Sequence, residues 1–83
     1  MVEFIVNQDR NRIYPCKVQS YFNIKTVKYN GIHIGESIYM DRCYLGTFET
    51  YAQAFEELRN ISNSDAEIYG INGYSEDAFT YVE

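Results

Sequence analysis

The sequence predicts an α+β fold, in which an antiparallel sheet of four or more strands carries one amphipathic helix on one face and a C-terminal strand or hairpin is added. Three observations support this prediction. Residues 2–45 consist of short β-rich runs separated by turn residues, residues 51–61 have helical periodicity, and residues 44–50 join the two as a strand end and a tight turn at Gly46. With one helix available, the other face of the sheet is open to water, a ligand or a partner.

The first hairpin is predicted near the N-terminus. Residues 2–6 form a short strand that is apolar at most positions, and the polar run 7–11 is typical of a hairpin turn. Residues 12–14 return as the second strand. Pro15 ends this strand because proline cannot donate a hydrogen bond to a ladder, so the strand suits the edge of a sheet.

A longer hairpin follows. Residues 17–29 form a β-rich segment whose apolar positions change phase near Lys25 and Thr26, which predicts a bulge or a turn there. Asn30 and Gly31 then predict a two-residue hairpin turn, because both central residues of a type I′ turn need a positive φ angle.

The second arm of this hairpin is the segment 32–40, where isoleucine and methionine occupy alternate positions on one face. The polar interruption at 35–37 predicts two short strands with a turn between them. Residues 42–45 then lead into the predicted turn at Gly46 and the helix.

The helix is predicted over residues 51–61 because its signals agree with one another. Thr50 followed three positions later by Gln53 is a capping box, so we expect the helix to begin at about Tyr51. The short polar side chains of residues 62–65 end it, since they compete for backbone hydrogen bonds. Apolar side chains at helical spacing predict one buried stripe, and the polar side chains face water. The predicted stripe comprises Tyr51, Ala54, Phe55, Leu58 and Ile61, and the water-facing set comprises Gln53, Glu56, Glu57, Arg59 and Asn60.

Length and composition favour a single domain, residues 1–83, with a sheet-and-helix part over 1–61 and an acidic, tyrosine-rich extension over 62–83. A hydrophobic content of 46% excludes a wholly disordered chain, and no apolar run approaches the roughly 20 residues of a membrane span. The N-terminus lacks the features of a secretion signal, so we expect a soluble cytosolic (cytoplasmic) protein. Cys16 and Cys43 fit no zinc or redox spacing, and we expect two part-buried thiols.

The charge of the chain is unevenly distributed. Residues 1–61 contain seven basic and seven acidic side chains, whereas residues 62–83 contain five acidic side chains and no basic one, and so carry the whole net charge of −5. Nine tyrosines exceed what a core of this size can bury with satisfied hydroxyl groups. Carboxylates beside tyrosines can imitate a nucleic-acid backbone and attract a basic protein. The predicted partner-binding residues are Asp65, Glu67, Tyr69, Tyr74, Glu76, Asp77 and Tyr81.

Two resemblances bear on function. The run Tyr44 to Ala54, with its Leu-Gly-Thr-Phe, an acid and a threonine before the helix, resembles the strand-to-helix segment of AP2-type DNA-binding domains. The span Phe4 to Ile61 resembles a group of short uncharacterised proteins of phages and mobile elements of Gram-positive bacteria. The first resemblance implies a helix behind a three-stranded sheet, with DNA contacts from the sheet through Lys25, Lys28 and Arg42.

No pattern in the sequence predicts catalysis, a metal site or a cofactor. His33 is the only histidine and has no metal-ligand companion or nucleophile at a fitting spacing, so we expect a sheet residue. The glycines form no phosphate-binding loop, and carboxylate pairs such as Glu56-Glu57 are sequence neighbours on solvated segments.

The favoured hypothesis is a non-catalytic small binding protein of phage or mobile-element type, an adaptor or inhibitor that binds a host protein through its acidic, tyrosine-rich C-terminal region. The acidic surface suggests a basic, nucleic-acid-handling protein or a defence protein as the partner. The first alternative is an AP2-like DNA-binding module, although net acidity repels phosphate. The second is a small-ligand-binding or enzymatic role. Monomer and two-fold homodimer stay open.

Overall fold

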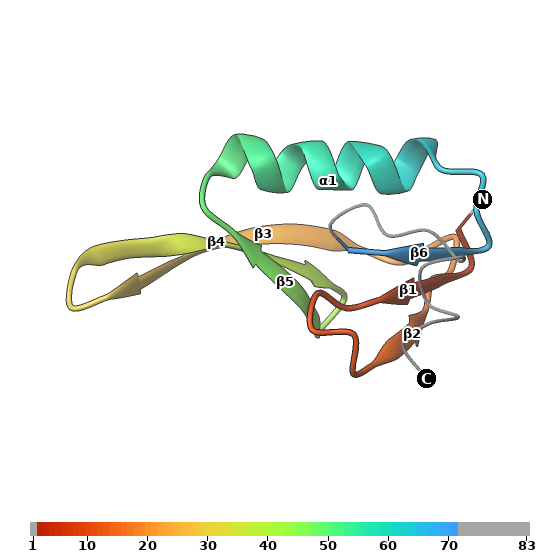
Figure 1. Ribbon diagram of the computed structural model, residues 1–83, viewed down its shortest axis with the longest axis horizontal. Helices are drawn as coiled ribbons and strands as arrows, with labels where there is room; N and C mark the ends of the chain where they lie inside the picture. Colours follow the sequence, from red (N-terminus) through yellow and green to blue (C-terminus); the bar gives the residue numbers. More distant parts are fainter. Residues whose placement is uncertain (1, 72–83) are drawn as a thin grey trace.

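The computed structural model describes residues 2–71, which form two three-stranded sheets and one helix (Figure 1). The sheet with strand order β2-β1-β6 is called sheet A, and the sheet with order β3-β4-β5 is called sheet B. The helix lies across one face of sheet B, and the β3–β4 hairpin projects beyond the start of the helix (Figure 1). The elements are β1 (Phe4–Val6), β2 (Ile13–Pro15), β3 (Phe22–Tyr29), β4 (Ile32–Met40), β5 (Cys43–Phe48), α1 (Tyr51–Asn63) and β6 (Ile68–Gly70).

The α+β class is confirmed, but in place of one sheet of four or more strands the described residues form two sheets of three. The chain leaves sheet A after Pro15 and begins sheet B at Phe22. It returns to sheet A at β6, which pairs parallel with β1, and the Ile71 N–H donates to the Val6 carbonyl at 3.1 Å. A C-terminal strand is therefore present. The second half of the predicted C-terminal hairpin lies outside the described residues.

Both predicted hairpins in the first half of the chain are present. β1 and β2 pair antiparallel around a turn held by Asn7, whose Oδ1 accepts from the N–H groups of Asn11 and Arg12 at 3.1 and 3.2 Å. β3 and β4 pair around Asn30 and Gly31, whose φ angles of 51° and 76° are the positive pair that a type I′ turn requires.

β4 runs without interruption, so the predicted turn at 35–37 is wrong. A Cβ atom on Gly35 would lie 2.7 Å from both the carbonyl oxygen of Phe48 and the Cγ2 atom of Thr47 in β5. Glycine is needed at this position because β5 approaches closely, not because the chain turns.

A bulge interrupts the β3–β4 ladder close to the predicted change of phase. The register shifts between Val27 and Lys28, where Ile34 of β4 is skipped. The extra residue belongs to β4, so β3 keeps strict alternation along its length. Lys25 and Lys28 consequently lie on opposite faces of sheet B.

The helix begins at Tyr51, as predicted, and ends at Asn63. Its capping box is confirmed, because Thr50 Oγ1 accepts from the Gln53 N–H and Gln53 Oε1 accepts from the Thr50 N–H, both at 3.2 Å.

The buried stripe of α1 is narrower than predicted. Ala54 and Ile61 are buried and Leu58 is half-buried, but Tyr51 and Phe55 remain 59% and 49% exposed. Sheet B ends at β3, and no described strand lies beyond it to cover the flank of α1 that carries the two aromatic rings. The sequence therefore predicts the helical periodicity correctly, but the prediction that the whole apolar stripe is buried is wrong.

Gln8 joins the two sheets. Its N–H donates to the Leu45 carbonyl at 2.7 Å, its side-chain Nε2 donates to the Thr47 carbonyl at 3.0 Å, and its Oε1 accepts from the Thr47 N–H at 2.9 Å. Gly46 lies inside β5 and not at the predicted turn. A Cβ atom there would be 2.8 Å from Gln8 Cβ, so glycine is required where Gln8 crosses the strand.

The core lies between α1, the inner face of sheet B and sheet A. Its buried side chains come from both ends of the chain, and β6 and the residue after it supply two of them, so residues 62–71 are part of the fold. The buried core residues are Val2, Ile5, Ile38, Met40, Leu45, Ala54, Ile61, Tyr69 and Ile71.

We expect Gln8→Glu to lower the free energy of unfolding by about 1–3 kcal/mol, because a carboxylate cannot donate to the Thr47 carbonyl and places an acceptor against it. Gln19→Glu makes the same change at an exposed turn position and is the matched control. Urea denaturation followed by circular dichroism measures both variants. Equal stability of the two would contradict the role given to the Gln8 side chain.

Candidate functional site

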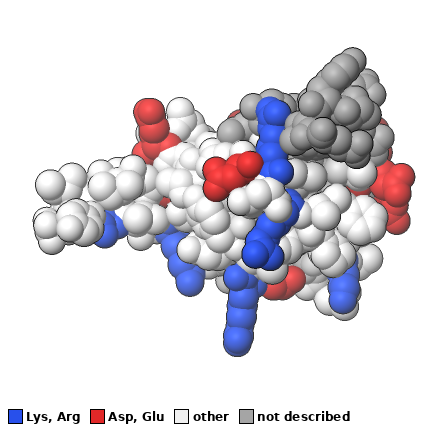
Figure 2. All heavy atoms as spheres, turned by 60° about the horizontal axis from the view of Figure 1, so that its bottom comes forward, with Lys and Arg blue, Asp and Glu red and all other residues white. Residues whose placement is uncertain are grey.

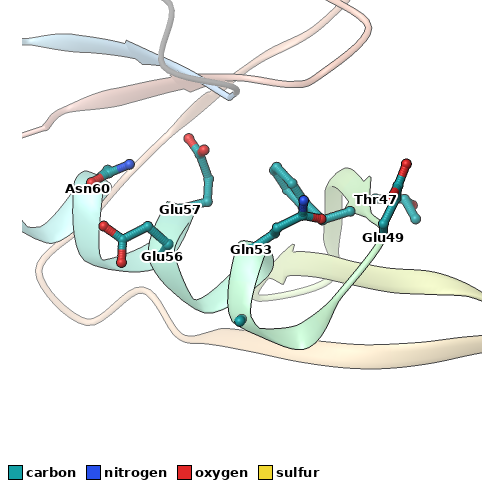
Figure 3. Close-up of a pocket in the computed structure, with 8 residues that line it drawn as sticks. Thr47, Glu49, Gln53, Glu56, Glu57 and Asn60 are labelled. Carbon is teal, nitrogen blue, oxygen red and sulfur yellow. The ribbon is translucent and has the colours of Figure 1, made fainter.

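A shallow, open cleft of about 650 Å³ lies between α1 and the end of β5. Figure 3 shows Glu57 extending from α1 and Glu49 extending from the segment that joins β5 to α1, both towards the same side of the ribbon. Phe48 and Ala52 give the cleft apolar surface, and carboxylates and amides give it polar surface. The lining residues are Thr47, Phe48, Glu49, Ala52, Gln53, Glu56, Glu57 and Asn60.

The described charges of this acidic cleft are of one sign. Glu49, Glu56 and Glu57 line it together with the amides of Gln53 and Asn60, and no Lys or Arg is among the lining residues within 2–71. The helical members share one flank of α1 because positions 53, 57 and 60 are separated by four and three residues. The arrangement presents hydrogen-bond acceptors and negative charge to whatever enters.

Glu57 forms the buried wall of the acidic cleft. The sequence predicts that Glu57 faces water, but it is 6% exposed because β6 lies against this flank of α1. The Tyr69 hydroxyl, itself on a residue 7% exposed, donates to Glu57 Oε2 at 2.6 Å. Burial, and then the hydrogen bond and charge of Glu57, raise the pKa of Tyr69 above its ordinary value. The tyrosine therefore stays a donor, and the buried carboxylate keeps a partner.

The other two carboxylates lie at the exposed rim of the acidic cleft. Glu56 accepts from Arg59 Nη1 at 3.1 Å, but both side chains are more than half exposed. An exposed ion pair of this kind contributes little to stability and exchanges easily with another partner. The rim charge therefore stays accessible to a cationic group from outside.

The predicted acidic, tyrosine-rich surface is divided by the structure. Asp65 and Glu67 are exposed beyond the end of α1, whereas Tyr69 is buried and its hydroxyl is used inside the fold. Tyr69 is therefore a core residue and not a surface contact, because β6 inserts beside β1 and turns the ring towards α1. The remaining predicted members, Tyr74, Glu76, Asp77 and Tyr81, lie outside the described residues.

Sequence reasoning missed the acidic cleft because Glu56 and Glu57 were weighed only as neighbours. The spacing of Gln53, Glu57 and Asn60 was a signal that could have been used, since it places three polar side chains on one flank of a helix. Glu49 could not have been added from sequence, because its place beside the helix depends on the path between β5 and α1.

The face of sheet B away from α1 has a different character. Lys25 Nζ lies 5.0 Å from the centroid of the Tyr39 ring, and Tyr39 packs edge-to-face on Tyr44 at 5.6 Å. Thr47 Oγ1 lies 2.8 Å from Ser37 Oγ and 2.6 Å from the Tyr44 hydroxyl. Figure 2, which looks towards the side of the molecule away from α1, shows Lys and Arg side chains interspersed with Asp and Glu side chains. The open face of sheet B thus carries Lys25 beside the aromatic rings of Tyr39 and Tyr44.

The predicted DNA-contacting residues are separated. Lys25 lies on the open face, and Arg42 is exposed in the turn between β4 and β5. Lys28 lies on the other face of β3, near Glu36, whose pKa is lowered first by the hydrogen bond with His33 and only last by the charge of Lys28. Residues an odd number of positions apart in a strand lie on opposite faces. The sequence spacing of Lys25 and Lys28 therefore already predicts that they do not share a face.

His33 and Cys16, two side chains of types that serve in catalysis or metal binding, have partners or burial within the fold. His33 lies in β4, as predicted, with Nε2 2.6 Å from Glu36 Oε2, and Thr26 Oγ1 donates to Glu36 Oε1 at 2.7 Å. The hydrogen bond from His33, followed by that from Thr26, lowers the pKa of Glu36. Burial raises the pKa of the Cys16 thiol. Within residues 2–71, no group of three or more His, Cys, Asp or Glu side chains is placed to hold a metal ion.

Comparison of the chain with protein-family models, with curated proteins and with solved structures found no match. The resemblances to AP2-type domains and to phage proteins therefore stay predictions. In the described part of the chain, the helix is too short and too polar to cross a membrane.

We expect Tyr69→Phe to lower the free energy of unfolding by about 1–3 kcal/mol at neutral pH, because the variant keeps the ring and removes the donor from a buried carboxylate. Tyr44→Phe removes a hydroxyl that bonds only at the exposed surface, and a loss of under about 1 kcal/mol is expected there. Chemical denaturation of both variants measures the difference. A Tyr69→Phe variant as stable as Tyr44→Phe would contradict the importance of the buried pair.

Proposed function

We propose that this chain is a small non-catalytic binding protein that holds a basic segment of a partner protein in the acidic cleft beside α1. The observation that carries the proposal is the one-sign lining of the cleft, in which Glu57 is buried in the wall and Glu49 and Glu56 stand at the rim. The expected partner is a basic host protein that handles nucleic acid, and its positive charge fits the negative charge of this site. The chain would act on it as an adaptor or inhibitor of phage type.

The cleft suits a lysine or arginine side chain in two respects. Phe48 and Ala52 offer apolar surface to the methylene stem, and the carboxylates offer acceptors to the cationic head. Phosphate is disfavoured at the same place, because three carboxylates repel it. A protein segment is therefore preferred over a nucleic acid at this site.

The first test is calorimetric titration of the full chain with an arginine-rich peptide. We expect the double substitution Glu49→Gln with Glu56→Gln to weaken binding by about tenfold or more, equivalent to about 1.4 kcal/mol. Both positions are exposed, so the fold is retained.

The matched control is Glu3→Gln with Asp9→Asn, which removes the same charge at two exposed positions outside the cleft. Binding by the control should stay close to that of the unaltered chain. Equal weakening by the two double variants would mean that net charge, and not the cleft, attracts the peptide.

Nucleic-acid binding by the open face of sheet B is the second candidate function. It is favoured by Lys25 over the Tyr39 ring and by the Tyr44 ring that packs on Tyr39. Exposed aromatic rings beside cationic side chains can stack bases and neutralise phosphates.

For this second candidate, Lys25→Gln with Arg42→Gln should weaken binding of a labelled DNA duplex and reduce the dependence on salt by about one unit per lost phosphate contact. Lys28→Gln with Arg59→Gln removes equal charge from other surfaces and should leave binding largely unchanged. Fluorescence anisotropy at low salt measures both. Absence of binding by the unaltered chain would exclude the DNA-binding reading.

A further inference from the structure

The outer edge of β3 is free among the described strands. β3 is the end strand of sheet B and is eight residues long. Tyr29 and Ile32 flank the two-residue turn and face each other in the ladder, and the Asp41 N–H donates to the Tyr21 carbonyl at the other end. Backbone groups of the odd-numbered residues of β3 therefore point to β4, and those of the even-numbered residues point outward.

An uncovered part of α1 stands above this edge. Tyr51 and Phe55 stack with ring centroids 6.3 Å apart and planes 16° apart, and both are about half exposed. They share a flank of α1 with Leu58, which lines a hollow together with Phe22 of β3. The opposite flank of α1, with Glu57, faces β5. The stacked rings therefore overhang the β3 side of sheet B.

The surface on this side has two levels, a strand edge below and an aromatic helix flank above. A single extended segment would pair with the edge and leave the rings uncovered. A second copy of this chain has the same two features, a free β3 edge and an aromatic helix flank above it, at the same separation, so it can cover both at once. We propose that a second copy of this chain occupies the surface, pairing β3 antiparallel with the β3 of its partner about a two-fold axis, so that sheet B becomes a continuous six-stranded sheet.

The charges of β3 exclude one register of this pairing, and an axis near the middle of the strand keeps most of β3 paired. A two-fold axis at Lys25 would place two lysines opposite each other on one face, which is unfavourable. An axis at Thr26, whose backbone groups point outward, places Lys25 opposite Val27 and Lys28 opposite Ile24 of the second copy. Each lysine then faces an apolar side chain, and the two threonines meet at the centre.

The same register brings the aromatic flanks together. Thr26 pairs with Glu36, and Glu36 pairs with Phe48, three residues before α1 begins, so the first turns of the helix lie at the level of Thr26. α1 packs on all three strands of sheet B with β4 in the middle. The two β4 strands would be three strand spacings, about 14 Å, apart. This exceeds the about 8–10 Å of direct helix packing, so large side chains such as Tyr51 and Phe55 are needed to fill the space.

The pairing is independent of the proposed function, because the acidic cleft lies on the other flank of α1. Both clefts of a dimer would stay open. The two-fold assembly would thus present two cationic-segment sites on one particle and raise the apparent affinity for a partner with repeated basic segments.

Sedimentation equilibrium of the full chain tests the pairing. We expect a dimer for the unaltered chain and loss of the dimer for Phe55→Glu, which places a charge in the seam. Asn63→Glu adds a charge to the same helix at an exposed position in its last turn, at the far end from the seam, and should leave the dimer intact. A monomeric unaltered chain, or a dimer that Phe55→Glu does not weaken, would overturn the proposal.

Amide hydrogen exchange gives a second readout that needs no variant. With rising protein concentration, the amides of Ile24, Thr26 and Lys28 should gain protection, while those of Lys25 and Val27 are protected throughout by β4. Concentration-independent exchange of the even-numbered amides would equally overturn the proposal, because no strand would then cover the edge of β3.

Discussion

The hydrogen bonds of Gln8 to β5 hold the two sheets together, and the rest of the fold depends on them. The side-chain amide of Gln8 takes the place of a peptide group against Thr47, and its backbone N–H bonds to Leu45. β1 is thereby fixed beside β5, and β6 follows because it pairs with β1. Tyr69 on β6 can then reach Glu57 on the helix. The acidic cleft is therefore a consequence of how sheet A docks on sheet B.

The sequence predicted the features that depend on a few neighbouring residues. The capping box of α1, the turn at Asn30 and Gly31, and the first hairpin need only local backbone chemistry, and all three are present. Features set by distant segments were misjudged. Gly35 and Gly46 were assigned to turns, although both allow another segment to approach a strand. The residues that approach Gly35 are more than ten positions away in the sequence, and the residue that approaches Gly46 is more than thirty positions away. No local sequence pattern predicts such contacts.

Helical periodicity located the faces of α1 but could not say which would be covered. Tyr51 and Phe55 continue the apolar stripe and stay exposed because sheet B ends at β3, whereas β6 buries Glu57. The cleft could be predicted in part, since Gln53, Glu57 and Asn60 share a flank by spacing alone. The burial of Glu57 in the cleft wall depends on the packing of β6 against α1, which the spacing does not predict. Residues 2–71 accordingly present three unlike surfaces: the acidic cleft, the face of sheet B that carries Lys25 beside aromatic rings, and the overhang above β3.

Binding at the acidic cleft is tested most directly by a map of backbone amide chemical shifts while an arginine-rich peptide is added to the full chain. We expect the largest changes at Thr47, Gln53 and Asn60, which line the cleft from both sides. Changes confined to Lys25, Tyr39 and Tyr44 on the opposite face, or no changes at all, would contradict binding at the cleft.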